Sequence, residues 1–249
     1  MTYQPLISGT NIKTIDNQPI LGSGNITIGG TSQPDSTELW LKFNGANNST
    51  DFIDESKNNY LIVPLNGNPI ISVIESKFGG SSLYLNGSSS LAAPSINFKT
   101  DWTVELWFKT NSSGYITLCA QDAGNANEQT FLITPVGCLV YYNYAYPVNP
   151  VLDDNKIIND NLWHHTALVR DKKSIFLYID GVLKQSLSNL VSLDYATITP
   201  FRIGFMPSYG RFFTGYIDNL RISSKAIYTP TLYPNGFTLP DESFNVTAL

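Results

Sequence analysis

The sequence predicts an all-β protein: an antiparallel β-sandwich jelly roll that follows a short extended N-terminal β arm. Beyond Asp35, apolar and polar residues alternate in short runs such as TELWLKF, WTVELWFKT and SIFLYIDG. This two-residue period is typical of strands with one buried face. Gly, Asn, Asp and Pro separate the runs, and no stretch of about a dozen residues shows the 3.6-residue period of a helix. Short strands with turn residues between them favour a sandwich or jelly roll.

The composition supports a folded protein and excludes several classes of partner. Of the 249 residues, 42% are hydrophobic and 14% are charged, so the chain can bury enough apolar surface to fold. The net charge is -5 and the longest basic run is Lys172 with Lys173, which argues against nucleic acid. No apolar stretch reaches the roughly 18 residues of a membrane span, and the first 20 residues lack the pattern of an export signal.

The first 33 residues differ from the rest of the chain. They contain one Lys, one Asp and one aromatic residue, and short β-like runs at 11–15 and 25–28 are separated by turn residues. So short a segment with few apolar side chains cannot close a core of its own. The sequence therefore predicts an anchoring or oligomerisation arm at 1–33 and a sandwich domain at 34–249. A disordered tail is the alternative for the arm.

Segment 163–187 predicts a three-stranded meander. Its charged turn at 171–174 separates two alternating strands. Further along, Asp180-Gly181 is a hairpin signal in which Gly supplies a positive φ. We therefore expect three consecutive strands to pair with their neighbours.

The run at 102–109 predicts a strand with two different faces. One face holds Trp102, Val104, Leu106 and Phe108, and the other holds Thr103, Glu105, Trp107 and Lys109. We expect the first face in the core and the second, with a solvated Glu105, on the surface. Trp107 is the exception there, an aromatic ring among polar neighbours.

Five segments resemble the laminin-G-like, concanavalin A-like jelly-roll superfamily. They are KFGGSSLYLNGSSSL (77–91), DWTVELWFKT (101–110), LWHHTALVRDKKSIFLYIDGVLKQS (162–186), RIG (202–204) and GYIDNLRISSKAIYTP (215–230). The last segment and the Phe237, Pro240 and Asp241 that follow it look most like versions of the domain in bacteriophage virion proteins. In the arm, SGTNIKTIDNQPILGSGNITI is similar to a module near the ends of phage tail and head fibre proteins.

The resemblance implies a non-enzymatic structural protein on the surface of a virion, either a head or tail fibre or a capsid-decoration subunit. The arm would bind a capsid or tail protein and form a homotrimer. The jelly roll would face outward and bind bacterial surface glycans. Two alternatives come from other classes: a stand-alone carbohydrate-binding lectin module, against which the missing export signal argues, and a glycoside hydrolase.

The sequence offers no catalytic motif. A retaining glucanase needs two carboxylates about 5 to 5.5 Å apart. Asp101 and Glu105 come nearest to that pattern, but Thr103 stands where an Asp is usual. The nucleophile elbow, the HExxH motif and the Gly-rich phosphate loop are all missing. We therefore expect no catalytic residues.

No cofactor is expected, and calcium is the one metal that the family pattern suggests. Asp54 and Asp218 lie where that pattern has an Asp, and hard oxygen ligands suit calcium. The alternative for Asp218 is that it accepts hydrogen bonds from nearby backbone amides and locks the last strands. His164 and His165 would point to opposite faces of a strand, so they cannot share a metal there, and we expect one packed and one solvated.

Tyrosines provide most of the predicted carbohydrate-binding residues. In LVYYNYAYPVNP, alternate tyrosines would share one face of an extended chain and offer flat apolar area with a polar tip. The candidates are Trp107, Tyr142, Tyr144, Tyr146, Tyr209 and Arg211. The alternative is that half of these tyrosines pack against the second sheet. Cys119 and Cys138 are expected to be free thiols, with a disulfide left open.

Overall fold

The computed structural model describes residues 36–98, 101–121, 129–143, 157–190 and 198–245. All of these residues belong to the unit Asp35–Leu249. The predicted arm at 1–33 lies outside the described residues, so its anchoring and oligomerising role stays a prediction. None of the described residues forms a helix with the length and apolar character that a membrane span requires.

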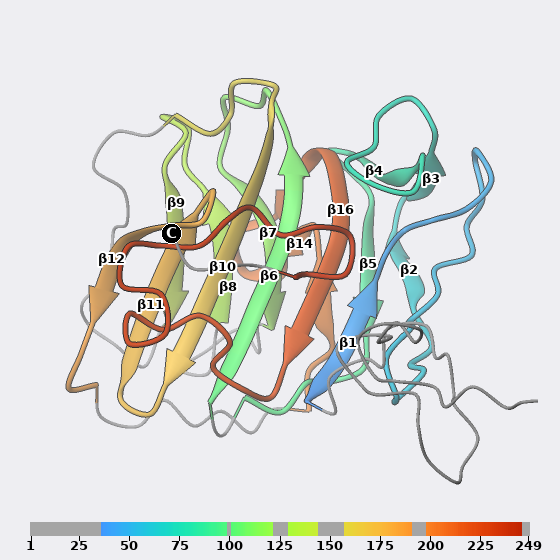
Figure 1. The fold of residues 1–249 in the computed structure, drawn as a ribbon. Helices are drawn as coiled ribbons and strands as arrows, with labels where there is room; N and C mark the ends of the chain where they lie inside the picture. The colour runs from blue at the N-terminus through green and yellow to red at the C-terminus, as the bar shows by residue number, and fades with distance from the viewer. Residues whose placement is uncertain (1–35, 99–100, 122–128, 144–156, 191–197, 246–249) are drawn as a thin grey trace, which may run out of the picture. The chain divides into compact units, whose positions relative to one another are not determined.

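Two antiparallel sheets make up most of the described part of the chain (Figure 1). The larger sheet has the order β12-β11-β10-β6-β16-β4-β3, with β1 also paired to β16. Its strands are β1 (Thr37–Leu41), β3 (Ile70–Ser72), β4 (Ser82–Asn86), β6 (Trp102–Lys109), β10 (Trp163–Asp171), β11 (Ser174–Ile179), β12 (Val182–Leu187) and β16 (Thr214–Ser223).

The smaller sheet has the order β2-β5-β13-β7-β8-β9. Its strands are β2 (Val63–Asn66), β5 (Ser90–Ala93), β7 (Ile116–Gln121), β8 (Gln129–Ile133), β9 (Leu139–Asn143) and β13 (Phe201–Ile203). A short hairpin of β14 (Phe205–Met206) and β15 (Arg211–Phe212) encloses the 3₁₀ turn η1 (Pro207–Tyr209). The predicted all-β sandwich is confirmed.

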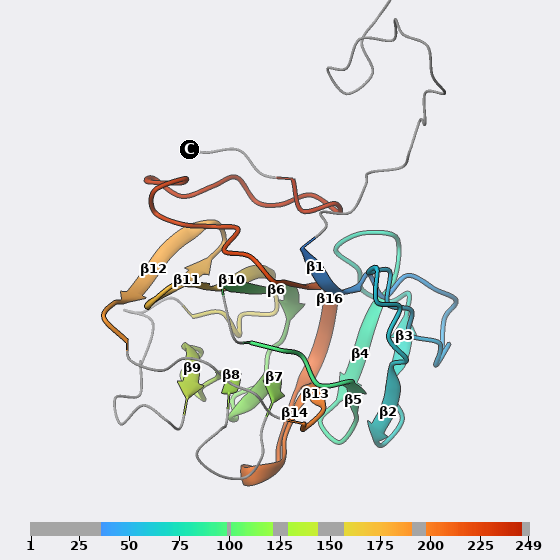
Figure 2. The same cartoon turned by 90° about the horizontal axis from the view of Figure 1, so that it is seen from below.

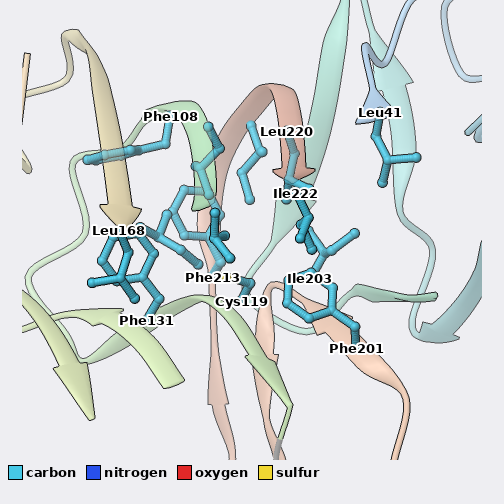
Figure 3. Close-up of a cluster of buried hydrophobic side chains, with 14 of the residues drawn as sticks. Leu41, Phe108, Cys119, Phe131, Leu168, Phe201, Ile203, Phe213, Leu220 and Ile222 are labelled. Atoms are coloured by element: carbon cyan, nitrogen blue, oxygen red, sulfur yellow. The ribbon is translucent and has the colours of Figure 1, made fainter. Parts of the chain in front are cut away.

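The main core lies between the two sheets (Figure 3). Phe108 and Leu168 reach into it from the larger sheet, and Phe131, Cys119 and Phe201 reach into it from the smaller one. The predicted core face of β6 is confirmed, because Trp102, Val104, Leu106 and Phe108 all belong to this cluster. Each fully buried Leu or Phe contributes about 1.5 to 3 kcal/mol relative to an exposed one, so this layer dominates the stability of the fold.

The predicted meander is also confirmed. β10 pairs with β11 and β11 pairs with β12, both antiparallel. The second turn is tight: Asp180 has φ 49 and Gly181 has φ 76. Two central residues with positive φ are typical of the type I′ turn, whose twist matches that of the flanking strands.

A C-terminal segment, residues 224–245, runs across the face of the larger sheet that points away from the smaller sheet (Figure 2). Tyr228 and Phe237 of this segment stack at 4.1 Å between ring centroids and pack with Tyr178 of β11. The backbone N–H of Phe237 donates to the carbonyl oxygen of Gly181 over 2.9 Å, so the segment also docks on the hairpin turn. A second apolar layer therefore lies outside the sandwich.

Three expectations about the outward face of the larger sheet are wrong. Trp107 is 1% exposed and Glu105 is 0% exposed, whereas both were expected to face water. The two histidines do lie on opposite faces, with His164 near Phe108 and His165 near Trp107, but both are buried. The physical reason is that the C-terminal segment and the turn that holds Phe78 cover this face.

Candidate functional site

The β14–β15 hairpin stands on the outward face of the smaller sheet. Met206 of β14 packs in a cluster with Ala120, Leu132 and Val140. These three residues alternate along their strands with residues of the main core, so they face away from it. Phe205 and Phe212 stack at 4.2 Å across the hairpin and stiffen it.

Two tyrosine rings flank one arginine at the tip of this hairpin. The guanidinium carbon of Arg211 lies 4.3 Å from the ring centroid of Tyr115 and 4.5 Å from that of Tyr209. The two rings remain accessible, with Tyr115 49% exposed and Tyr209 59% exposed. We call these three residues the Tyr–Arg cluster. It offers flat apolar area next to a cation, on a surface that water reaches.

The local backbone explains how the chain brings these side chains together. Tyr209 ends the 3₁₀ turn, and Gly210 follows in the left-handed region with φ 62 and ψ 32. The N–H of Gly210 donates to the carbonyl oxygen of Pro207 over 3.2 Å and closes the turn. Glycine takes up such a conformation without steric cost, so Arg211 can return beside Tyr209. Tyr115 arrives separately, directly before β7.

Arg211 has no carboxylate partner within the described ranges. The ion pairs in that part of the chain involve other cationic residues. They join Arg221 to Glu105, Lys42 to Glu55, Lys109 to Glu75, Lys57 to Glu38, His164 to Asp160 and Asp180, and His165 to Glu105. The guanidinium of Arg211 therefore holds its five N–H donors beside the tyrosine rings, and no acid among the residues that the structure describes competes for them.

The structure brings together only some of the predicted carbohydrate-binding residues. Tyr209 and Arg211 lie side by side as described above. Trp107 is buried in the outward face of the larger sheet, on the other side of the sandwich, so it cannot stack on a ligand from solution. Tyr115 was missed by sequence reasoning, although its place in the Ser- and Gly-rich NSSGY turn before a strand is a signal for an exposed ring.

The tyrosine run of the sequence lies mostly outside the described residues. Tyr142 pairs with Thr130 in the ladder between β8 and β9, and Tyr144 and Tyr146 follow beyond the described part of the strand. Their predicted role in binding stays a prediction. Tyr141, one residue earlier, is buried and belongs to the main core.

Asp54 is fully used as a structural carboxylate. Its Oδ1 accepts hydrogen bonds from the backbone N–H groups of Trp40 and Ser56, and its Oδ2 accepts from the hydroxyl of Ser56 and the N–H of Tyr60. Four donors take up the usual capacity of a carboxylate. The residue therefore fixes the loop after β1.

Asp218 accepts hydrogen bonds from nearby backbone amides, which is the alternative to calcium binding that the sequence left open. Its Oδ2 accepts from the backbone N–H groups of Lys77 and Phe78 over 2.7 and 3.0 Å, which ties β16 to the turn before β4. Burial raises the pKa of Asp218 to about 7, although these amides partly oppose the shift. The described residues include no group of three or more His, Cys, Asp or Glu arranged to hold a metal ion. Calcium at Asp54 and Asp218 stays a prediction.

Glu105 is not placed to serve as a catalytic carboxylate. Its Oε1 accepts from Arg221 and its Oε2 accepts from the hydroxyl of Tyr228, so both oxygens are occupied in a buried site. Asp101 accepts a hydrogen bond from the backbone N–H of Lys172. Cys119, which is buried in β7, and Cys138 form no disulfide with each other.

Comparisons with known proteins give one family and several solved structures. The family model of the concanavalin A-like lectin/glucanases superfamily matches residues 85–230. No curated protein matches the chain. Domain 4 of AbnA, a GH43 extracellular arabinanase from Geobacillus stearothermophilus in complex with arabinotriose, has 23% identity and a TM-score of 0.58, with 79% of this chain and 95% of that chain covered.

Two toxin structures show a similar fold. The binding domain of Paraclostridial Mosquitocidal Protein 1 has 17% identity and a TM-score of 0.59, with 78% of this chain and 50% of that chain covered. A structure of botulinum neurotoxin type C, whose cell entry depends on two ganglioside molecules, has 14% identity and a TM-score of 0.58. The match covers 78% of this chain and 49% of that chain. The chain thus spans about half the length of these two toxin chains, and the likeness is one of fold.

Proposed function

Because the chain belongs to the concanavalin A-like lectin/glucanases superfamily, we propose that it is a carbohydrate-binding module whose glycan binds at the Tyr–Arg cluster. The observation that carries the proposal is the pair of exposed tyrosine rings in contact with Arg211. A tyrosine ring offers an apolar face on which the C–H face of a sugar can stack, and its hydroxyl can bond to sugar hydroxyls.

The comparisons supply a second, independent support for this class of ligand. The arabinanase domain was solved with arabinotriose, and the neurotoxin depends on gangliosides, so both have ligands that carry sugars. Neither protein tells which sugar this chain binds. The cluster combines accessible aromatic faces with a cation that pairs with no acid among the described residues.

Replacement of the two rings tests the proposal. We expect Tyr209→Ala and Tyr115→Ala in the full chain to weaken glycan binding about two- to twelvefold each, because one aromatic contact is worth roughly 0.5 to 1.5 kcal/mol beyond its buried area. Binding is measured on a glycan array and then by calorimetry with the glycans found. Leu232→Ala is the control, since Leu232 is 58% exposed in the C-terminal segment, on the opposite side of the sandwich.

The proposal fails if both tyrosine variants keep their thermal stability and bind every glycan as the unchanged protein does. Binding that is absent already in the unchanged protein, across a broad array, would also refute it. A loss that Leu232→Ala shares would point to general unfolding instead of the cluster, and would count against the site.

We further propose that the arm at 1–33 attaches the module to a virion, as a homotrimer bound to a capsid or tail protein. The support is the sequence SGTNIKTIDNQPILGSGNITI, which is similar to a phage fibre module. Light scattering of the full chain and of residues 34–249 tests this proposal. We expect a trimer that binds particles only when the arm is present, and two monomers that both fail to bind particles would refute it.

A further inference from the structure

We infer that the glycan bound at the Tyr–Arg cluster is acidic, and that Arg211 binds its carboxylate. This inference rests on the proposed function and names the class of sugar: a uronic or sialic acid type with a free carboxylate. The structural basis is a guanidinium that lies against two tyrosine rings and has no acidic partner in the described part of the chain.

The first step concerns the hydrogen bonds of the guanidinium. Other arginines in the described ranges donate hydrogen bonds to protein groups. Arg221 donates to Glu105, and Arg170 donates to the backbone oxygens of Phe98 and Lys172. Arg211 makes ring contacts instead, and its N–H groups donate to none of the described residues. A ligand that covers Arg211 removes water from those donors, and this desolvation is unfavourable unless the ligand accepts hydrogen bonds from them. A carboxylate offsets it most fully, because two parallel N–H donors match its two oxygens.

The second step concerns the order that the side chain already has. A free arginine loses roughly 2 kcal/mol of rotamer entropy when it is fixed by a ligand. Both tyrosine rings contact the guanidinium before any ligand arrives, and the 3₁₀ turn with Gly210 fixes the backbone beneath it. Part of the conformational entropy of the Arg211 side chain is therefore already lost in the free protein. This favours an ion pair with fixed hydrogen-bond geometry over one in which the side chain stays mobile.

The third step excludes a general attraction of anions by the whole protein. The net charge is -5, so the long-range field repels a polyanion. At physiological salt, charges further away than about 8 Å are largely screened. Only the local cation beside the rings can favour an acid, so we expect selectivity for a single carboxylate on a stacked sugar instead of adhesion to any polyanion.

The test compares each acidic glycan with its own neutral form. The array carries sialylated and uronate-containing glycans beside their asialo or carboxyl-reduced counterparts. We expect the full chain to bind the acidic member of a pair at least tenfold more tightly, since charge-assisted hydrogen bonds are worth roughly 1.5 to 3 kcal/mol. Arg211→Gln should lower that preference to about one, and Arg211→Lys should keep part of it, because lysine retains the charge without the bidentate fork.

Two controls separate this inference from the proposed function. Lys173→Gln removes an exposed cation away from the cluster and should leave the preference unchanged. Tyr209→Ala should weaken the binding of both acidic and neutral glycans, because both would stack on its ring. Equal binding of both members of each pair, with Tyr209→Ala still harmful, would overturn the inference and leave the proposed function intact. Acid selectivity that survives Arg211→Gln would overturn it as well. No binding to either form would refute the proposed function together with it.

Discussion

Arg221 of β16 and Glu105 of β6 form a cross-strand ion pair that is buried under the C-terminal segment. They are directly opposite in the ladder, and Nε and Nη2 of Arg221 lie 2.9 and 2.6 Å from Oε1 of Glu105. Tyr228 donates its hydroxyl to Oε2 over 2.7 Å, and the guanidinium lies 4.2 Å from the ring centroid of Phe244. Burial alone would raise the pKa of Glu105, but Arg221 and the other donors outweigh it and hold the pKa below its ordinary value. The pair therefore joins the sheet to the segment that covers it.

Loss of one partner of this pair should be costly. We expect Arg221→Met to lower the free energy of unfolding by about 3 to 5 kcal/mol, because it leaves the charge of Glu105 buried without its cationic partner. Urea denaturation measures the change. Lys42→Met is the matched control: it breaks the more exposed pair with Glu55 and should cost less than about 1 kcal/mol. Equal costs for the two variants would contradict the assignment.

His164 should make stability depend on pH. Its Nδ1 lies 2.9 Å from Asp180 and its Nε2 lies 3.0 Å from Asp160. Burial by itself lowers the pKa of His164, but these two carboxylates outweigh it and raise the pKa above the ordinary 6.5. The folded state thus binds the proton more tightly than the unfolded state. The resulting stabilisation is fully present below about pH 6.5 and is lost as the pH rises through the folded pKa.

The variant His164→Asn isolates this contribution. We expect the gap in unfolding free energy between the unchanged protein and the variant to be widest at pH 6 and to narrow toward pH 9. Chemical denaturation at a series of pH values measures the gap. A gap that stays constant over this range would show that the two carboxylates do not stabilise the protonated imidazole.

Asp218 should make stability depend on pH in a lower pH range than His164 does. Its pKa is ordinarily near 3.8 and is raised to about 7 by burial in the folded protein. Between these values the folded state keeps a proton that the unfolded state has released, so stability falls as the pH rises from about 4 to 7. Asp218→Asn cannot ionise, yet its side-chain oxygen can still accept from the amides of Lys77 and Phe78. We therefore expect the variant to gain stability relative to the unchanged protein over this range and to level off above it. A difference independent of pH would refute this account.

The sequence predicted those parts of the fold that depend on short-range patterns. The alternation at 102–109 identified the core face of β6, and Asp180-Gly181 identified the hairpin. The same alternation misplaced Trp107, because the residues that bury it, Phe78 and His165, come from 29 and 58 positions away. A strand pattern shows which residues share a face, but it does not show what covers that face.

In the candidate site, too, only the part that depends on residues close in sequence could be predicted. Tyr209 and Arg211 are close in sequence, and both were candidates from predicted exposed strand or loop positions. Tyr115 completes the cluster from a strand end 94 positions before Tyr209, and no local pattern connects the two. Only the pairing of the smaller sheet and the packing of the β14–β15 hairpin on it bring Tyr115 to Arg211.

Gly181 should be essential for the attachment of the C-terminal segment. It has φ 76, and a Cβ at this position would overlap the carbonyl oxygen of Phe237. Gly80 is the matched control, with φ 81 and no atom within 4 Å of the added Cβ. Gly80→Ala should cost only the roughly 1 to 2 kcal/mol of a left-handed L-residue. Gly181→Ala should cost about 1 to 3 kcal/mol more, because Phe237 must shift from its stack with Tyr228. Urea denaturation with near-ultraviolet circular dichroism measures both effects, and equal costs would show that the segment does not depend on this contact.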